Sequence, residues 1–328
     1  MLVHIFKVFR FVLRFIKTQN QFNERYIDSY LQPFYLQYHK QLKASTLVKI
    51  KKYYCLALPM TCASYAKIYN RALTEKESVY AVLAGILIPL LDDFTDEKTL
   101  SNADLDQLTT FPADYRPQTL EEAIVKTIIC YLLENVKKPE DCINLLRQII
   151  QAQHWSQRQT DADVSREELL NISLEKGGHS LVLFHFLLDE EPNRQTIDTL
   201  YLMGGILQIC NDIFDLYKDY QEGIATYANT CDDFNVLIAF YTNKCRQFVK
   251  EARKLPYSSN NIEFFITFFV IVMARGAVAL RRLRKLQIQL GGGVLPISQL
   301  DRKQLICDME KPMNFLKTAW FTYNILLK

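Results

Sequence analysis

Three carboxylates end a long apolar segment of the chain. Residues 81–91 read AVLAGILIPLL and are followed at once by DDFTD at 92–96. In a helix, Asp92 and Asp96 lie one turn apart on the same face, with Asp93 beside them. Neighbouring carboxylates repel one another unless a cation lies between them, and Mg²⁺ prefers such oxygen ligands. The pattern predicts a divalent-cation site, with a solvated acidic helix end as the alternative.

A second row of oxygen-bearing side chains follows another apolar segment, YLMGGILQIC. Asn211, Asp215 and Asp219 recur every four residues, so they trace one face of a helix, and Asp212 lies beside them. Buried carboxylates without a counter-charge are costly. Two such helices facing each other across a cavity would hold several Mg²⁺ ions, which could neutralise a diphosphate.

A third feature is EKGGHS at 175–180, inside a segment with helical periodicity. Each glycine in a helix interior costs about 1 kcal/mol relative to alanine. We expect Gly177 and Gly178 to break or kink the helix and turn backbone groups inward, with Lys176 supplying a positive charge to a phosphate. A close helix–helix contact that requires glycine is the alternative.

Helices must position these residues. Gly and Pro number only 10 each among 328 residues, too few for the frequent turns of an all-β fold. We expect an all-α fold: a single domain at 21–328, with about ten helices around a central cavity, preceded by an N-terminal helix at 1–20. A long connector is expected at 101–118. The expected helices of the domain are 22–43, 45–70, 74–96, 117–136, 139–158, 165–188, 194–220, 232–254, 259–287 and 299–326.

Charge and cysteine content exclude two classes of protein. The net charge of +3, from 39 basic and 36 acidic residues, is too balanced for a nucleic-acid partner. The eight cysteines form no CxxC pair, so neither a zinc knuckle nor a dithiol redox site is expected. Their apolar neighbours predict reduced, buried thiols in a cytoplasmic protein.

The N-terminal segment LVHIFKVFRFVLRFIK, at 2–17, places Lys7, Arg10, Arg14 and Lys17 on one stripe of an otherwise apolar helix. The apolar run is interrupted too often to span a bilayer, and no signal-peptide cleavage site follows it. Three interpretations stay open: a helix packed on the domain with its basic stripe in solvent, a surface for a partner, or an interfacial helix giving peripheral membrane association.

The acidic motifs resemble those of a known superfamily. DDFTD looks like the first aspartate-rich motif of class I isoprenoid synthases, which comprise trans-prenyl diphosphate synthases and terpene cyclases. GGILQICNDIFDLYKD is similar to the second-motif helix of the prenyl synthases, with Gln208 at a matching position and Asn211 replacing the first Asp. Asp212, Asp215 and Asp219 also match that pattern. The same segment resembles a variant of the cyclases' Asn/Ser/Glu triad.

The third feature adds to the resemblance, because LEKGGHSLVLF is similar to the Lys-containing kinked helix of prenyl synthases. The likeness covers about residues 45–290 and implies the isoprenoid synthase fold, three Mg²⁺ ions and an allylic prenyl diphosphate substrate. It also implies metal ligands in both acidic motifs and diphosphate contacts from Lys176, Gly177, Gly178 and Gln208. Helical homodimers are common in the family.

Two differences from the family's motifs limit which reactions are expected. DDFTD runs into EKTLSNADLD without the Arg pair of chain-elongating synthases, and no Gly precedes Gly85 to form their Gly-Lys-x-Arg element. The isopentenyl diphosphate site is therefore expected to be missing. The Arg-Tyr pair of many bacterial cyclases is also absent, with Arg275, Arg281 and Arg282 as stand-ins.

We therefore expect a terpene synthase, a carbon–oxygen lyase that ionises one prenyl diphosphate with Mg²⁺ and forms a terpene by cyclisation or elimination. Asp92, Asp96, Lys176 and Asp215 would act in catalysis. One alternative is a prenyltransferase that joins the allylic cation to an acceptor or to a second prenyl diphosphate. The other is a non-catalytic helical binding protein.

Overall fold

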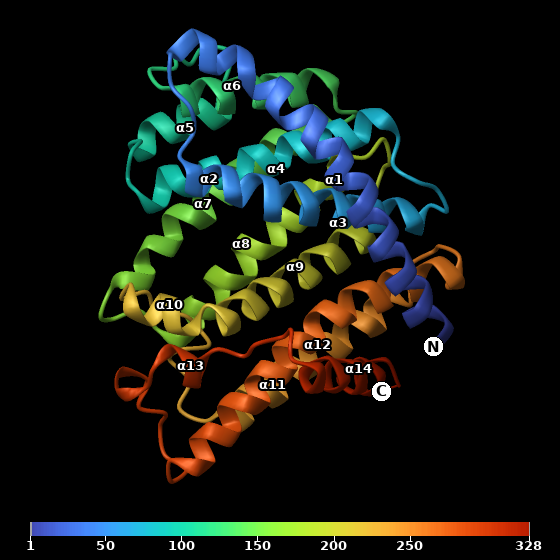
Figure 1. Cartoon of the computed structure of the whole chain (residues 1–328), viewed down its shortest axis with the longest axis vertical. Coiled ribbons are helices and arrows are strands. Elements are labelled where there is room, and N and C mark those ends of the chain that lie inside the picture. The colour runs from blue at the N-terminus through green and yellow to red at the C-terminus, as the bar shows by residue number, and fades with distance from the viewer. Residues whose placement is uncertain (1, 328) are drawn as a thin grey trace. The chain divides into compact units, whose positions relative to one another are not determined.

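Helices account for 77% of the chain, and residues 2–327, the part that the structure describes, contain no strand (Figure 1). This structure, a computed structural model, confirms the all-α class. Contacts among the helices divide the chain into two compact units, each described by itself. Unit 1 comprises Met1–Ile5, Trp155–Leu181 and Asn193–Lys328, and unit 2 comprises Phe6–His154 and Val182–Pro192.

Unit 2 is built around α4 (Glu75–Asp96), the helix that ends in the first acidic motif. Its start is fixed by a capping box, in which the Thr74 hydroxyl accepts from the Glu77 amide and the Glu77 carboxylate accepts from the Thr74 amide. Nearly all of residues 80–91 are buried, and α4 contacts η1, α3 and α6. The other elements of this unit are most of α1 (Leu2–Tyr38), α2 (Ala44–Val48), the π-helical turn η1 (Lys49–Tyr54), α3 (Cys55–Ile68), α5 (Asn102–Thr110), α6 (Leu120–Asn135) and most of α7 (Pro139–Ser156).

Unit 1 has α12 at its centre, in contact with α9, α11 and α14 (Figure 1). Large side chains such as Phe265, Phe269 and Tyr241 are fully buried there. The unit thus holds a packed core beside α9, the helix that leads into the second acidic motif. Its elements are η2 (Gln157–Thr160), most of α8 (Arg166–Phe186), α9 (Arg194–Phe214), α10 (Leu216–Gln221), α11 (Phe234–Ala252), α12 (Ser259–Gln289), η3 (Ile297–Gln299), α13 (Arg302–Leu305) and α14 (Pro312–Leu327).

Two helices, α4 and α12, are long and apolar enough to cross a membrane by length and composition alone. In their most apolar windows, however, 67% of α4 and 72% of α12 is buried inside the protein. Core helices of a globular protein show the same length and apolar composition, because a helix surrounded by other helices needs apolar residues on most of its faces.

Several helix boundaries differ from those expected. α1 runs unbroken from Leu2 to Tyr38, so the separation expected near residue 20 lies inside one helix. The expected connector at 101–118 contains α5, which begins where the Ser101 hydroxyl accepts from the Asp104 amide. The last predicted helix is instead two, α13 and α14. These errors arise because a short capped helix or a polar stretch of a long one carries little apolar periodicity.

The N-terminal part of α1 exposes apolar side chains as well as its cations. Val8 is buried, whereas the basic stripe is exposed. More than half of each of four apolar side chains is also exposed, namely Val3, Phe6, Phe9 and Leu13. The packed-helix interpretation thus accounts for one face only, and lipid contact through residues 2–17 stays a prediction.

All eight cysteines carry free thiols, and all but Cys130 are buried. Burial raises the pKa of thiols such as Cys62 and Cys142. A thiol with a raised pKa stays protonated and is a poor nucleophile. These side chains therefore pack as small hydrophobic groups.

Candidate functional site

The first acidic motif occupies the last turn of α4 in unit 2. Asp92 and Asp96 are four residues apart in the helix, as predicted, and Asp96 is exposed. Asp92 accepts a hydrogen bond of 3.1 Å from the hydroxyl of Tyr54. Burial and the neighbouring carboxylates raise the pKa of Tyr54, so its hydroxyl stays protonated and able to donate. This edge of α4 therefore presents two carboxylates, one helical turn apart.

Asp93 has a different role, because its carboxylate is held from two sides. The Thr46 hydroxyl donates to its Oδ2 at 2.7 Å, and Lys49 Nζ lies 2.6 Å from its Oδ1. The hydrogen bond to Asp93 raises the pKa of Lys49 and keeps the ammonium charged. Asp93 thus ties α4 to the segment containing α2 and η1.

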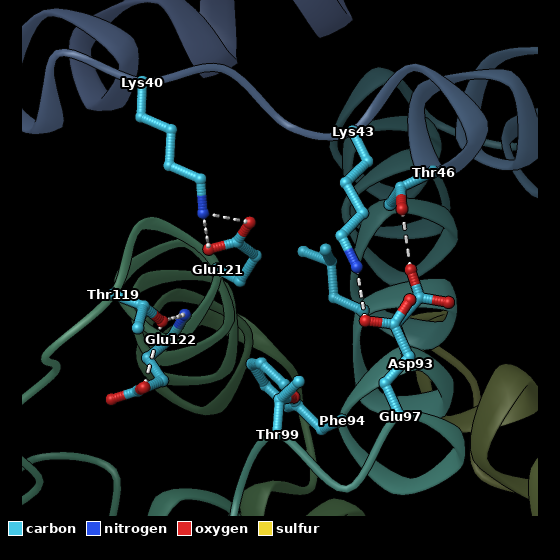
Figure 2. Close-up of a pocket in the computed structure, with 11 residues that line it drawn as sticks. Lys40, Lys43, Thr46, Asp93, Phe94, Glu97, Thr99, Thr119, Glu121 and Glu122 are labelled. Atoms are coloured by element: carbon cyan, nitrogen blue, oxygen red, sulfur yellow. Dashed lines mark hydrogen bonds and ion pairs between the residues drawn. The ribbon is translucent and has the colours of Figure 1, made fainter.

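A pocket of about 170 Å³ lies on the Asp93 side of α4 (Figure 2). Its two lysines are already matched by carboxylates: Lys40 Nζ lies 3.0 Å from Glu121, and Lys43 pairs with Glu97. Figure 2 shows both lysines reaching from the segment after α1 toward these acids. Because the lining carries more carboxylates than ammonium groups, this pocket does not fit a phosphate.

The second acidic motif lies in unit 1, where one helix gives way to another. The sequence predicts a single helix through Asp219, but α9 ends at Phe214, and Asp215 is the joint before α10. The helical spacing survives this joint. The Asp215 amide donates to the Asn211 carbonyl at 2.9 Å, and the Asp219 amide donates to the Asp215 carbonyl at 2.8 Å. Asn211 Nδ2 also donates to Asp215 Oδ2 at 3.1 Å.

The carboxylates at this joint repel one another. Burial, followed by the charges of Asp212 and Asp215, raises the pKa of Asp219 to about 7. A carboxyl pKa raised in this way reflects burial together with neighbouring negative charge. A bound cation would relieve this repulsion.

Asp212 is buried and faces α8 instead of joining the row of Asn211, Asp215 and Asp219. The Ser173 hydroxyl donates to its Oδ2 at 2.7 Å, and Gln208 Nε2 donates to its Oδ1 at 2.9 Å. Burial raises the pKa of Asp212, while these two hydrogen bonds and the charge of Lys176 partly offset that rise. The charge of Lys176 therefore acts on Asp212, and its contact with a diphosphate stays a prediction.

The two glycines of α8 do not break the helix, so the expected break is wrong. α8 is continuous from Arg166 to Phe186, and its backbone touches that of α9. A Cβ on Gly177 would lie 2.3 Å from the Gly204 carbonyl oxygen, and one on Gly178 would lie 2.6 Å from the Tyr201 ring. The close helix–helix contact is the correct interpretation. It places Ser173 and Lys176 of α8 beside the acidic end of α9.

Of the three arginines considered as diphosphate contacts, one lies near the second motif. The Arg275 guanidinium is 5.8 Å from the Phe214 ring centroid, next to the joint. Arg281 instead lies over the rings of α14, and Arg282 donates to backbone carbonyls of α13. A role of any of the three arginines in diphosphate binding stays a prediction.

The structure adds four residues that sequence analysis did not single out. Ser173 stands one turn before Lys176, so helix spacing could have indicated it. Thr46, Lys49 and Tyr54 carry no such signal, because a π-helical turn changes the spacing on which face arguments depend.

Within residues 2–327, no three His, Cys, Asp or Glu side chains are grouped as a complete metal site. Mg²⁺ is commonly bound by one or two carboxylates, with water and substrate phosphates completing its shell. Each acidic motif supplies such a partial set: Asp92 with Asp96, and Asn211 with Asp215 and Asp219. The residues therefore fit an ion that is held together with a diphosphate. The sharing of one diphosphate by the two motifs stays a prediction.

No protein-family model and no curated protein matches this chain.

Proposed function

We propose that this protein is a class I terpene synthase, which ionises a prenyl diphosphate in a Mg²⁺-dependent reaction. The observation that carries the proposal is the acidic joint between α9 and α10. There, Asn211, Asp215 and Asp219 repeat at helical spacing, and burial, followed by the charges of Asp212 and Asp215, raises the pKa of Asp219 to about 7. Such a cluster is suited to a divalent cation and its anionic ligand. The resemblance of DDFTD to the first motif of this superfamily supports a diphosphate as that ligand.

Each of the two acidic motifs would bind part of the metal cluster. Asp92 and Asp96 would hold ions at the end of α4, and the acidic joint would hold a third. When bound, Mg²⁺ stabilises the negative charge that develops on the departing diphosphate. Lys176 adds a positive charge from α8. Tyr54 keeps Asp92 oriented through its hydrogen bond.

In the proposed reaction, the bond between the allylic carbon and the diphosphate oxygen breaks, and both electrons leave with the oxygen. The resulting carbocation, with or without first closing a ring, then loses a proton to the released diphosphate and becomes a neutral hydrocarbon. Arg275 and Phe214 lie beside the joint. There the aromatic face can stabilise positive charge without acting as a strong nucleophile.

The test is incubation of the full chain and Mg²⁺ with prenyl diphosphates of different chain lengths, with inorganic diphosphate and extracted hydrocarbons both measured. Asp92→Asn and Asp215→Asn should each abolish diphosphate release, because each replaces a charged metal ligand. Asp106→Asn in unit 2 and Asp163→Asn in unit 1 are matched controls, since both carboxylates are largely exposed, at 58% and 81%. These two variants should retain full activity.

The same incubation separates the alternatives. Hydrocarbon formed from one prenyl diphosphate alone supports the lyase, whereas turnover only after an acceptor or second prenyl diphosphate is added indicates a transferase. Absence of turnover together with absence of Mg²⁺-dependent thermal stabilisation by inorganic diphosphate would leave a helical binding protein.

A further inference from the structure

The C-terminal helix α14 presents a continuous apolar stripe to solvent. Five residues at alternating spacings of three and four share one helix face and are between 42% and 61% exposed, namely Met313, Leu316, Trp320, Tyr323 and Leu327. Phe315 beside them is 62% exposed. Exposed large apolar residues are common singly, but a contiguous row of this kind marks an interaction surface.

The opposite face of α14 is already occupied by the protein core. Phe321, Ile325 and Leu326 are buried there, and α14 contacts α11 and α12. Lys317 is the only charged residue among residues 312–327. An apolar helix face is normally matched by apolar surroundings. The protein core provides such surroundings on the buried face of α14 only.

Basic residues surround the exposed stripe. The last 48 residues, 281–328, carry nine basic and three acidic residues, a net charge of +6, whereas the whole chain carries +3. Lys311 and Lys317 are exposed at the beginning and in the middle of α14. The Arg281 guanidinium lies 5.8 Å from the Trp320 ring centroid and is exposed beside the stripe. The apolar row is thus bordered by cations from two helices.

We infer that this face of α14 docks on an anionic lipid surface. The stripe would enter the boundary between head groups and acyl chains, with Trp320 and Tyr323 at head-group level and the cations against lipid phosphates. A second copy of the chain fits less well, because pairing of two such faces would bring their basic borders together. The inference is independent of the proposed catalysis.

The experiment uses the full chain carrying Trp155→Phe, which leaves Trp320 as the only tryptophan. It is mixed with vesicles of phosphatidylcholine, alone or with about 30 mol% phosphatidylserine. We expect flotation with the anionic vesicles, a blue shift of Trp320 emission and quenching by brominated lipid. Lys317→Gln should weaken binding about fivefold, and added salt should weaken it further.

A second pair of variants separates the stripe from general surface apolarity. Leu316→Ser with Trp320→Ser, in the otherwise unchanged chain, should reduce flotation at least tenfold, while Val236→Ser, at a 63% exposed residue of α11, should leave it unchanged. The inference is overturned if the chain does not float. It is also overturned if the chain floats while Trp320 emission stays constant, which would assign binding to another segment such as residues 2–17. A lipid-free dimer that the double variant converts to a monomer would assign the stripe to a second copy instead.

Discussion

The contact between α8 and α9 makes a sharp prediction about the substitution Gly177→Ala. A Cβ at this position would lie 2.3 Å from the Gly204 carbonyl oxygen and 2.7 Å from the Gln208 Cβ. Ordinary contact begins near 3.4 Å, so the two helices must separate by about 1 Å. The nearest atom belongs to the backbone and cannot rotate away.

The expected loss of stability follows from two opposing effects. Overpacking of a close contact costs about 1–3 kcal/mol, whereas alanine favours the helix over glycine by about 1 kcal/mol. Gly177→Ala should therefore lower the free energy of unfolding by up to about 2 kcal/mol. Without the contact, the same substitution would raise the free energy of unfolding by about 1 kcal/mol. The sign of the measured change therefore shows whether the close contact exists.

Urea unfolding followed by far-ultraviolet circular dichroism measures this change. Gly293→Ala is the control, since no atom lies within 4 Å of its added Cβ, and its effect should stay within about 0.5 kcal/mol. Gly204→Ala probes the same contact, because its added Cβ would lie 2.2 Å from the Gly177 carbonyl oxygen. Once the helices have separated for one methyl group, the second costs less, so the double variant should lose less than the sum of the single losses. Stabilisation by Gly177→Ala, or strict additivity, would refute the contact.

Three further predictions concern buried polar groups. Ser173→Ala removes a donor to the buried Asp212 carboxylate and should cost about 1–3 kcal/mol in the same urea assay. Arg71→Met should cost about 3 kcal/mol, because the side chain of Glu77 is 0% exposed and loses its charged partner at 2.6 Å. The double variant Glu77→Gln with Arg71→Met removes the unpaired charge and should lose less stability. An equal loss would argue against unpaired charge as the cause. The third prediction concerns Asp219 in the metal-free protein, with EDTA present. Its pKa is raised to about 7 in the folded state from the ordinary 3.8, so between these pH values the folded state holds a proton that the unfolded state has released. Stability should therefore fall as pH rises from about 4 to 7, by roughly 1–2 kcal/mol after allowance for solvent screening; Asp219→Asn should flatten this pH dependence.

The helical class and the faces of the acidic motifs could be predicted because they depend on local periodicity. The capping box of Thr74 and Glu77 begins α4 close to the predicted residue, and the apolar run before Asp92 is buried. The even spacing of Asn211, Asp215 and Asp219 survives a helix joint because two backbone hydrogen bonds bridge it.

Tertiary contacts decided what could not be predicted. Gly177 and Gly178 have low helix propensity, but the close approach of α9 makes glycine the residue that fits, and the helix continues through both positions. The separate role of Asp93 depends on Thr46 and Lys49, more than forty residues away in the chain. No spacing within DDFTD distinguishes Asp93 from Asp92.

The central claim is that both acidic motifs bind divalent ions around one diphosphate. The most direct measurement is a crystal structure of the full chain grown with Mn²⁺ and inorganic diphosphate, with anomalous scattering used to locate the metal. We expect anomalous peaks beside Asp92 and Asp96 and beside Asp215 and Asp219, all in contact with the same diphosphate. Peaks at only one motif, or separate diphosphates at the two motifs, would contradict the claim.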